Sequence, residues 1–396
     1  MTKSTRGSRV VLIAGVLGLL AAIALGASRA GADSGGTAAL GGQGFQDIAS
    51  VTAVDGGFLA VGSEERGSSR PAAAWRGSAN GHSWSRLDDL PTLALDGEPT
   101  TEALGVTSGD GGTTIAVGSV AETPTGIIKP GSYVPFDALF WRSTDGRNFD
   151  LTTKDLAEDG VNHTANAVAF GDATFVAVGK SSVQSGKPAC EQPLAWYSTD
   201  DGRSWTKANV PVPAGGSGAA HAVAWSADVG FVAVGETYQE NCVYGNGSTA
   251  AIWISQDGET WQLDALPDGG AAVGVAISDE GVAVVGAGRT HSGDECDAVY
   301  WTSVDFKSWR ATKPDRTERA AAVTALADGS FVAVGAKCKQ PFAVPVAYAS
   351  TAGRGQWKTL KVDDSRPGLM NAVAPKGRTG FVVVGSEHSN GAAWWT

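Results

Sequence analysis

The chain has 396 residues, of which 54 are glycine, 13 are tryptophan and only 18% are charged. So many turn-forming residues and so few charges exclude a helical bundle or a coiled coil, and a hydrophobic content of 42% excludes an intrinsically disordered chain. The formal net charge of −11 disfavours nucleic acid as a partner, because nucleic-acid sites require basic grooves.

The first 32 residues are typical of a targeting segment. Three basic residues lie within the first nine positions, an apolar run covers residues 10–27, and Ala30-Gly31-Ala32 offers small residues to a signal peptidase. We therefore expect residues 1–32 to be a signal peptide cleaved before Asp33, which makes the protein secreted or extracytoplasmic in the cell envelope. The apolar run is also just long enough to span a bilayer, so a retained single N-terminal membrane anchor is the alternative.

A pentapeptide of the type Phe-Val-Ala-Val-Gly recurs through the rest of the chain at intervals of roughly fifty residues. Each repeat holds four short segments rich in valine, alanine and aromatic residues, separated by turn-forming residues, which is typical of four antiparallel strands. Seven such units predict an all-β fold, a seven-bladed β-propeller, with residues 33–396 as its single domain. The terminal glycines of the pentapeptides are Gly62, Gly118, Gly179, Gly235, Gly286, Gly335 and Gly385.

The last repeat contains only its first three predicted strands, and it ends at Thr396. The segment around residues 36–41 precedes the first strand of the first repeat and has no other assigned place. We therefore predict that this N-terminal segment supplies the fourth strand of the last blade and closes the ring.

The turn between the third and fourth strands carries a serine–aspartate motif. Residues 198–205 read Ser-Thr-Asp-Asp-Gly-Arg-Ser-Trp, and related turns recur in other repeats. This turn resembles the Asp-box, or bacterial neuraminidase repeat, of the sialidase-like β-propellers. The resemblance implies that these turns are scaffold and lie away from any active site. The residues assigned to this structural role are Ser198, Asp200, Gly202 and Trp205, with Ser255, Asp257 and Trp261 in the next repeat.

Most tryptophans recur at two positions of the repeat, which predicts an architectural role and not a ligand surface. The third-strand set is Trp75, Trp141, Trp196, Trp253, Trp301 and Trp395. The turn set is Trp84, Trp205, Trp261, Trp309 and Trp357. Only Trp225 and Trp394 fall outside these two sets.

The loops between the second and third strands vary most in length, and long loops on a rigid scaffold are where binding residues gather. We call the propeller face from which these loops leave the long-loop face and predict that it carries the binding site. The candidate binding residues in these loops are Glu191, Glu236, Tyr238, Glu240, Arg289 and His291. Asn166, His221 and Asn371 begin innermost strands and are predicted to line the mouth of the central channel.

All four cysteines, Cys190, Cys242, Cys296 and Cys338, lie in these loops. Four cysteines in an exported chain indicate disulfides, and Cys190–Cys242 with Cys296–Cys338 is the simplest of three possible connectivities. A four-cysteine zinc site is the rival interpretation, but no Cys-x-x-Cys spacing supports it. The acidic segment 291–297 is interpreted as a solvated loop in preference to a metal cluster. We predict no metal and no cofactor.

Two functions compete. The first is a non-enzymatic, monomeric interaction module at the cell envelope that binds a protein or a glycan on the long-loop face. The alternative is a sialidase-like glycoside hydrolase acting on extracellular glycans. The resemblance implies for such an enzyme an arginine trio, a tyrosine–glutamate nucleophile pair and an acid/base aspartate. The Phe/Tyr-Arg-Ile-Pro motif of those sialidases is absent here, and they have six blades.

A third class is an assembly factor, similar to the seven-bladed Asp-box proteins that help to build photosynthetic complexes, which is an analogy of fold alone. The sequence also contains no Gly-rich phosphate loop, no His-Glu-x-x-His and no Gly-x-Ser-x-Gly motif. No catalytic residue is therefore assigned from the sequence.

Overall fold

The computed structural model describes residues 36–93, 99–121, 136–155, 161–183, 190–238, 248–288, 296–313, 317–338, 343–350, 356–362, 367–387 and 390–396. These residues belong to one compact unit, Asp33–Thr396. The predicted signal peptide, residues 1–32, lies outside the described residues.

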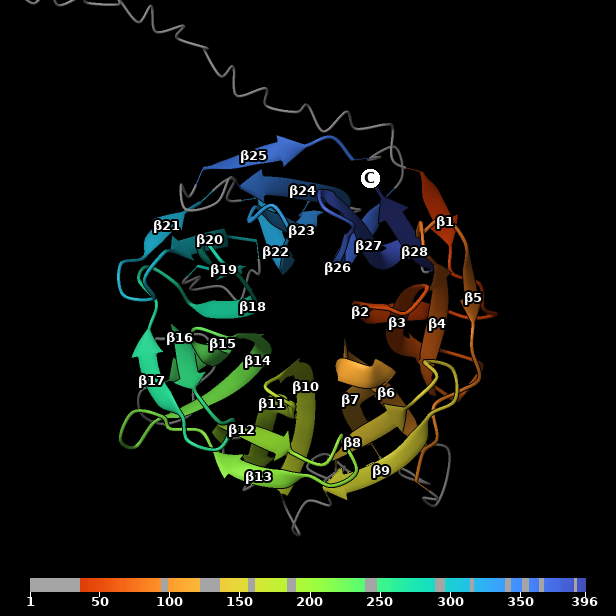
Figure 1. Ribbon diagram of the computed structural model, residues 1–396, viewed down its shortest axis with the longest axis horizontal. Coiled ribbons are helices and arrows are strands. Elements are labelled where there is room, and N and C mark those ends of the chain that lie inside the picture. Colours follow the sequence, from red (N-terminus) through yellow and green to blue (C-terminus); the bar gives the residue numbers. More distant parts are fainter. Residues whose placement is uncertain are drawn as a thin grey trace, which may run out of the picture. The chain divides into compact units, whose positions relative to one another are not determined.

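The described strands form seven antiparallel sheets of four strands, arranged as blades around a central axis (Figure 1). Blades 1 to 3 consist of β2 (Gln46–Val54), β3 (Gly57–Glu64), β4 (Ala72–Ser78) and β5 (Trp84–Arg86); β6 (Thr100–Ser108), β7 (Thr114–Ala121), β8 (Phe136–Ser143) and β9 (Asp150–Asp155); and β10 (Val161–Gly171), β11 (Thr174–Val183), β12 (Cys190–Ser198) and β13 (Thr206–Asn209).

Blades 4 to 6 consist of β14 (Ser217–Ser226), β15 (Gly230–Tyr238), β16 (Ser248–Ser255) and β17 (Gln262–Ala265); β18 (Ala271–Ser278), β19 (Gly281–Ala287), β20 (Ala298–Ser303) and β21 (Arg310–Thr312); and β22 (Glu318–Ala325), β23 (Phe331–Lys337), β24 (Val344–Ser350) and β25 (Trp357–Leu360). Blade 7 contains β26 (Gly368–Lys376), β27 (Gly380–Glu387), β28 (Asn390–Trp395) and β1 (Thr37–Ala39). The predicted seven-bladed β-propeller is confirmed.

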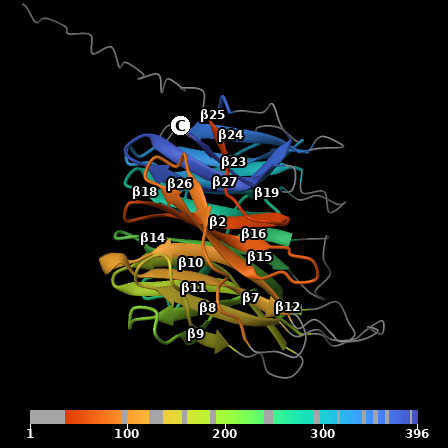
Figure 2. The same cartoon turned by 90° about the vertical axis from the view of Figure 1, so that its right-hand side faces the viewer.

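The ring is closed by the N-terminal strand, as predicted. Strand β1 pairs antiparallel with β28 and is the outermost strand of blade 7, with Thr37 opposite Trp394 and Ala39 opposite Ala392. The backbone N–H of Leu40 extends the pairing with a 3.0 Å hydrogen bond to the carbonyl of Gly391. The two ends of the described chain therefore meet in one blade, where Figure 1 shows β1 beside β28, and Figure 2 shows the same blades from the side.

The hydrophobic core lies between the blades and not within them. The described residues form seven buried clusters, and each cluster draws on two neighbouring blades; one of them joins Leu59 and Val61 of blade 1 to Ala103 and Trp141 of blade 2. The second strand of each blade packs on both sides, so its Phe-Val-Ala-Val run is buried without alternation. Burial on both faces explains why the pentapeptide repeats so faithfully.

Each innermost strand carries a β-bulge at the same point, and the bulge explains the last residue of the pentapeptide. The register of β14 against β15 shifts between Ala220 and Ala222, with Gly235 opposite Ala220. A Cβ on Gly235 would overlap the carbonyl oxygen of Ala219, so only glycine fits there. The other six described innermost strands show the same shift. The residues left at the seven bulges are Ala49, Leu104, Asn166, His221, Val273, Ala321 and Asn371.

The third-strand tryptophans join blades through their indole N–H groups. Trp301 donates a 2.6 Å hydrogen bond to the carbonyl of Pro267, on the segment that crosses from blade 4 to blade 5. Trp141 and Trp253 bond Pro91 and Pro211 in the same way, and Trp75 bonds Gly41 after β1. These rings are fully buried. Their role is therefore architectural.

One tryptophan assignment from the sequence is wrong. Trp394, and not Trp395, occupies the third-strand position of blade 7, because Trp394 lies opposite Val383 as Trp75 lies opposite Ala60. Trp394 is only 5% exposed, whereas Trp395 is partly buried and stacks on His82 with ring centroids 4.4 Å apart. The two tryptophans are adjacent in the sequence, so the strand register is needed to tell them apart.

The turns between third and fourth strands are held together by their own serine and aspartate. The hydroxyl of Ser198 donates to Asp200 Oδ1 at 2.8 Å, and the same carboxylate accepts the backbone N–H groups of Arg203 and Ser204 at 3.1 and 2.9 Å. Burial would raise the pKa of Asp200, but the hydroxyl and N–H of Ser204 outweigh it and lower the pKa to about 2. Ser255, Asp257 and Gly258 repeat the arrangement in blade 4, and the indole of Trp261 bonds the carbonyl of Gly258 at 3.0 Å. We call the face that carries these turns the Ser–Asp turn face.

Candidate binding site at the channel mouth

A cavity of about 540 Å³ lies at the end of the central channel on the long-loop face, and we call it the channel mouth. It is lined by the beginnings of the innermost strands of blades 1, 4, 5, 6 and 7 and by the ends of β15 and β19. Its floor consists of five alanines and Val273, and its polar groups are Asp47, His221, Glu236, Arg319 and Asn371.

The bulges deliver five of the side chains that line the cavity. A bulge leaves one extra residue on the innermost strand, and that residue projects toward the axis without a partner on the second strand. His221, Val273, Ala321 and Asn371 all reach the cavity in this way, as does Ala49. The propeller thus presents residues from several blades to one space.

His221 and Glu236 form a pair within blade 4. The Nε2 of His221 lies 3.4 Å from Oε1 of Glu236, and both side chains are largely buried. Burial would raise the pKa of Glu236, but the hydrogen bond and the charge of His221 outweigh it and lower the pKa. Tyr238 and Lys180 act in the same direction. Glu236 is therefore held as a carboxylate at neutral pH.

Blade 1 contributes the carboxylate of Asp47 to the cavity, and Arg70 binds this carboxylate. The guanidinium of Arg70 lies 3.2 Å from Asp47 Oδ2 and 3.2 Å from Glu102 Oε1, so it joins the first strands of blades 1 and 2. Its Nε also donates to the hydroxyl of Ser63 at 2.9 Å. Arg319 of blade 6 brings a further cation to the cavity lining. The channel mouth therefore combines an apolar floor with side chains of both charge signs.

The structure brings only some of the candidate binding residues to the cavity. His221, Glu236 and Asn371 line it, and Tyr238 lies buried beside Glu236. Glu191 is buried in blade 3 and pairs with Lys180 at 2.5 Å.

The two bulge asparagines bond to the backbone of the next blade. Asn166 Nδ2 donates to the carbonyl of Ala220 at 2.8 Å, and Asn371 Nδ2 donates to that of Ile48 at 2.9 Å. Glu240, Arg289 and His291 lie outside the described residues.

The sequence interpretation missed Asp47 and Arg319. Both directly precede the residue that lies opposite the pentapeptide glycine, Ile48 opposite Gly62 and Ala320 opposite Gly335. Because side chains alternate along a strand, this position and the bulge residue two places later are both directed toward the channel. Aligning the repeats on the glycine and reading back to the first strand would have found both residues.

The long-loop face also carries a disulfide between neighbouring blades. Cys296 and Cys338 are bonded, with their Cα atoms 6.1 Å apart, and they join the second-to-third-strand connections of blades 5 and 6. This confirms one of the two predicted pairs. Cys190 is the first residue of β12, and Cys242 lies outside the described residues, so the second pair stays a prediction.

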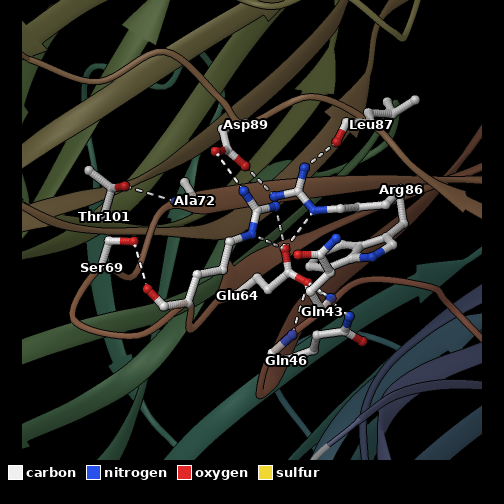
Figure 3. Close-up of polar contacts among 12 residues, drawn as sticks. Gln43, Gln46, Glu64, Ser69, Ala72, Arg86, Leu87, Asp89 and Thr101 are labelled. Atoms are coloured by element: carbon white, nitrogen blue, oxygen red, sulfur yellow. Dashed lines mark hydrogen bonds and ion pairs between the residues drawn. The ribbon is translucent and has the colours of Figure 1, made fainter.

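Glu64 on the same face belongs to the scaffold (Figure 3). Its fully buried carboxylate accepts 2.8 Å hydrogen bonds from Arg66 and from Arg86, and one of 2.6 Å from the N–H of Gln43. Burial would raise the pKa of Glu64, but the N–H of Gln43 and the guanidinium of Arg66 outweigh it and lower the pKa to about 2. Gln46 bonds Glu64 and also accepts the N–H of Gly391 at 2.6 Å, which ties the cluster to blade 7.

Two further findings concern the described residues as a whole. Within the described ranges, no group of three or more histidine, cysteine, aspartate or glutamate side chains is placed to hold a metal ion. No helix in the described part of the chain is long and apolar enough to cross a membrane, and the apolar run at residues 10–27 lies outside that part.

Comparison with known proteins gives a likeness of fold. No protein-family model matches the chain, and no curated protein matches it. Among solved structures, one described as YCF48 bound to D1 peptide is 12% identical, with a TM-score of 0.53, and the match covers 92% of this chain and 97% of that one. A Penicillium chrysogenum α-L-arabinanase complexed with arabinobiose is 14% identical over 75% of this chain and 93% of that one, with a TM-score of 0.44. At 12% identity, the likeness to the first of these structures shows the propeller fold alone.

Proposed function

We propose that this protein is an exported, non-enzymatic interaction module that binds a polypeptide segment of a partner at the channel mouth. The observation that carries the proposal is the convergence of bulge residues from several blades on one cavity, together with Asp47, Glu236 and Arg319. A rigid concave site with an apolar floor and a few placed polar groups is the usual form of a binding site.

The lining favours a polypeptide over a glycan. Sugars are commonly held against exposed aromatic rings, and the described lining of the cavity has no aromatic side chain apart from the imidazole of His221. The third-strand indoles are buried between blades. Small apolar side chains beside charges of both signs suit a peptide, whose backbone and side chains supply complementary groups.

The hydrolase alternative finds less support in the same cavity. Asp47 and Glu236 are two carboxylates lining one space, which is the minimum that a glycosidase needs. A general acid needs a raised pKa, however, and that of Glu236 is lowered because His221 stabilises its charged form. A carboxylate held in this way is suited to binding a cation or an N–H group.

Export is part of the proposal. Disulfides form and persist in oxidising compartments, so the Cys296–Cys338 bond supports an extracytoplasmic location independently of the N-terminal sequence. We propose that the mature protein is secreted or held in the cell envelope, with residues 1–32 serving as signal peptide or anchor.

The proposal can be tested by affinity capture from the host's envelope with immobilised residues 33–396. We expect the Glu236→Gln/Arg319→Gln double variant to lose at least one protein that the wild type recovers. Lys358→Gln, an exposed substitution on the outermost strand of blade 6, serves as the matched control and should recover the wild-type set. Equal recovery by all three proteins would overturn the proposal. Loss of a glycan in place of a protein would favour the glycan alternative, and turnover of a fluorogenic sialoside would favour the hydrolase.

A further inference from the structure

A side chain on each of several third strands reaches across to the Ser–Asp turn of the following blade. It belongs to the residue directly after the third-strand tryptophan. In blade 2 this residue is Arg142, whose guanidinium binds the carboxylate of Asp201 in the turn of blade 3 and donates to the Asp201 carbonyl at 2.7 Å. In blade 3 it is Tyr197, whose pKa is raised by burial and by the charge of Glu259 in the turn of blade 4.

Blade 7 follows the same rule. Trp395, directly after Trp394, stacks on His82 in the turn of blade 1. Each of these links therefore joins a third strand to a side chain in the next turn.

Arg76 occupies this position in blade 1, and the turn of blade 2 gives it no carboxylate. The turn of blade 3 reads Ser-Thr-Asp-Asp-Gly, whereas that of blade 2 reads Ser-Thr-Asp-Gly, so the counterpart of Asp201 is missing. Among the described residues, Arg76 makes no ion pair, and its Nη2 donates to the backbone carbonyl of Asp55. Burial and the charge of Arg147 lower the pKa of Arg76, and the charge of Asp55 opposes them in part.

A cavity of about 770 Å³ lies between Arg76 and the turn of blade 2. Arg76 lines it together with the first-to-second-strand connections of blades 1 and 2 and the turn residues Thr144–Gly146. All of these elements belong to the Ser–Asp turn face, so the cavity lies on the side of the propeller opposite to the channel mouth. The hydroxyls of Ser108, Thr114 and Thr144 and the N–H groups of a glycine-rich loop at residues 109–112 add hydrogen-bonding groups.

We propose that this cavity binds a carboxylate group of a ligand, placed against Arg76 as the carboxylate of Asp201 is placed against Arg142. The interface between blades 2 and 3 contains this arginine–carboxylate contact within the chain, whereas the interface between blades 1 and 2 has the arginine alone. A guanidinium is well matched to a carboxylate, with which it forms paired charge-assisted hydrogen bonds. The carboxylate belongs either to a small organic acid or to the C-terminus of a polypeptide.

The acidic residues in the lining limit the affinity for an anion, although none of them forms an ion pair with Arg76 among the described residues. The carboxylate of Asp145 accepts hydrogen bonds from the backbone N–H groups of Arg147 and Asn148, both at 2.8 Å, and so stabilises the turn to which it belongs. Asp55 and Asp110 also line the cavity and oppose an anion. We therefore expect dissociation constants on the order of millimolar for a small carboxylate, with binding weakened by added salt.

The test uses residues 33–396 and succinate, monitored by the NMR signal of the Arg76 Nε–H group at constant ionic strength. We expect a saturable shift in the wild type and a melting temperature raised by about 2 °C at tenfold excess over the dissociation constant. Arg76→Gln should abolish the rise in melting temperature. Inserting an aspartate after Asp145, which recreates the turn of blade 3, should also abolish it and should raise the melting temperature without ligand.

Two further arms identify the source of the carboxylate and separate this site from the channel mouth. A peptide with a free C-terminus that binds more tightly than succinate, and than its amidated form, would assign the site to a chain end; equal binding of succinate and the free peptide would assign it to small acids. Glu236→Gln/Arg319→Gln should leave the succinate response unchanged. A response to succinate that matches the response to chloride, or that survives in Arg76→Gln, would overturn the proposal.

Discussion

Replacing Glu64 with glutamine should destabilise the propeller, and the size of the effect should depend on pH. Glu64 is fully buried, and its carboxylate binds both Arg66 and Arg86. Its pKa is lowered from 4.5 to about 2, which corresponds to about 3 kcal/mol of folding free energy at neutral pH, because one pKa unit is worth about 1.4 kcal/mol. Removing one partner of a buried charge pair costs about 3 to 5 kcal/mol, so we expect a loss in this range at pH 7.

The sign of the pH dependence follows from the lowered pKa. The unfolded carboxyl takes up its proton near pH 4.5 and the folded one near pH 2, so the contribution of Glu64 is complete above about pH 5 and decreases as the pH falls toward 2. About 2 kcal/mol of it should be lost by pH 3. The gap in unfolding free energy between wild type and Glu64→Gln should therefore narrow by that amount between pH 6 and pH 3.

The measurement is denaturant unfolding of wild type and Glu64→Gln at a series of pH values. Glu65→Gln is the matched control, since Glu65 is the adjacent residue, has the same chemistry and is exposed. Its curve should follow that of the wild type. Other acidic groups titrate in all three proteins and cancel in the differences. A gap that stays constant from pH 6 to pH 3, or a Glu65→Gln curve that resembles that of Glu64→Gln, would refute the assignment of this stability to the buried cluster.

Three further perturbations test the architecture. Deleting residues 33–42 removes β1 and should lower the melting temperature sharply, and an unchanged melt would contradict closure by this strand. Gly235→Ala should lower the free energy of unfolding by roughly 3 kcal/mol or more, because its Cβ would overlap a first-strand carbonyl. The control Gly215→Ala has open space and should cost only about 1 kcal/mol, because of its positive φ. Equal costs in denaturant unfolding would argue against the bulge explanation. Replacing Cys296 and Cys338 together with serine opens a loop whose ends are 42 residues apart and should cost up to about 4 kcal/mol, measured against the wild type with and without reductant.

The blade count and the ring closure were predictable from the sequence because the signals are local and repeated. The second strand of each blade packs on both sides, so its residues are constrained and recur as an unbroken apolar run ending in glycine. Trp394 shows where this reasoning ends. Two adjacent tryptophans stand at this point of the last repeat, and only the register of Trp394 with Val383 shows which of them takes the third-strand position.

The site was less predictable, for a physical reason. His221 and Asn371 were found because polar side chains stand out at the start of a strand, whereas Ala49 and Ala321 at the equivalent bulges carry no chemical signal. Arg76 could not be recognised from its own neighbourhood at all. Its significance depends on a residue missing from the turn of the next blade, more than sixty positions along the chain.

The pairing of β1 with β28 also means that the ring can close only after residues far apart in the chain are both present. Strand β1 is the first of the described strands and has its hydrogen-bonding partner at residues 392–394, so it stays unpaired until those residues have been synthesised. An unpaired strand edge that is exposed during the folding of a long β-protein can pair with another chain and cause aggregation. Strand β1 has only three residues, Thr37–Ala39, and therefore offers few backbone groups for such pairing before β28 is available.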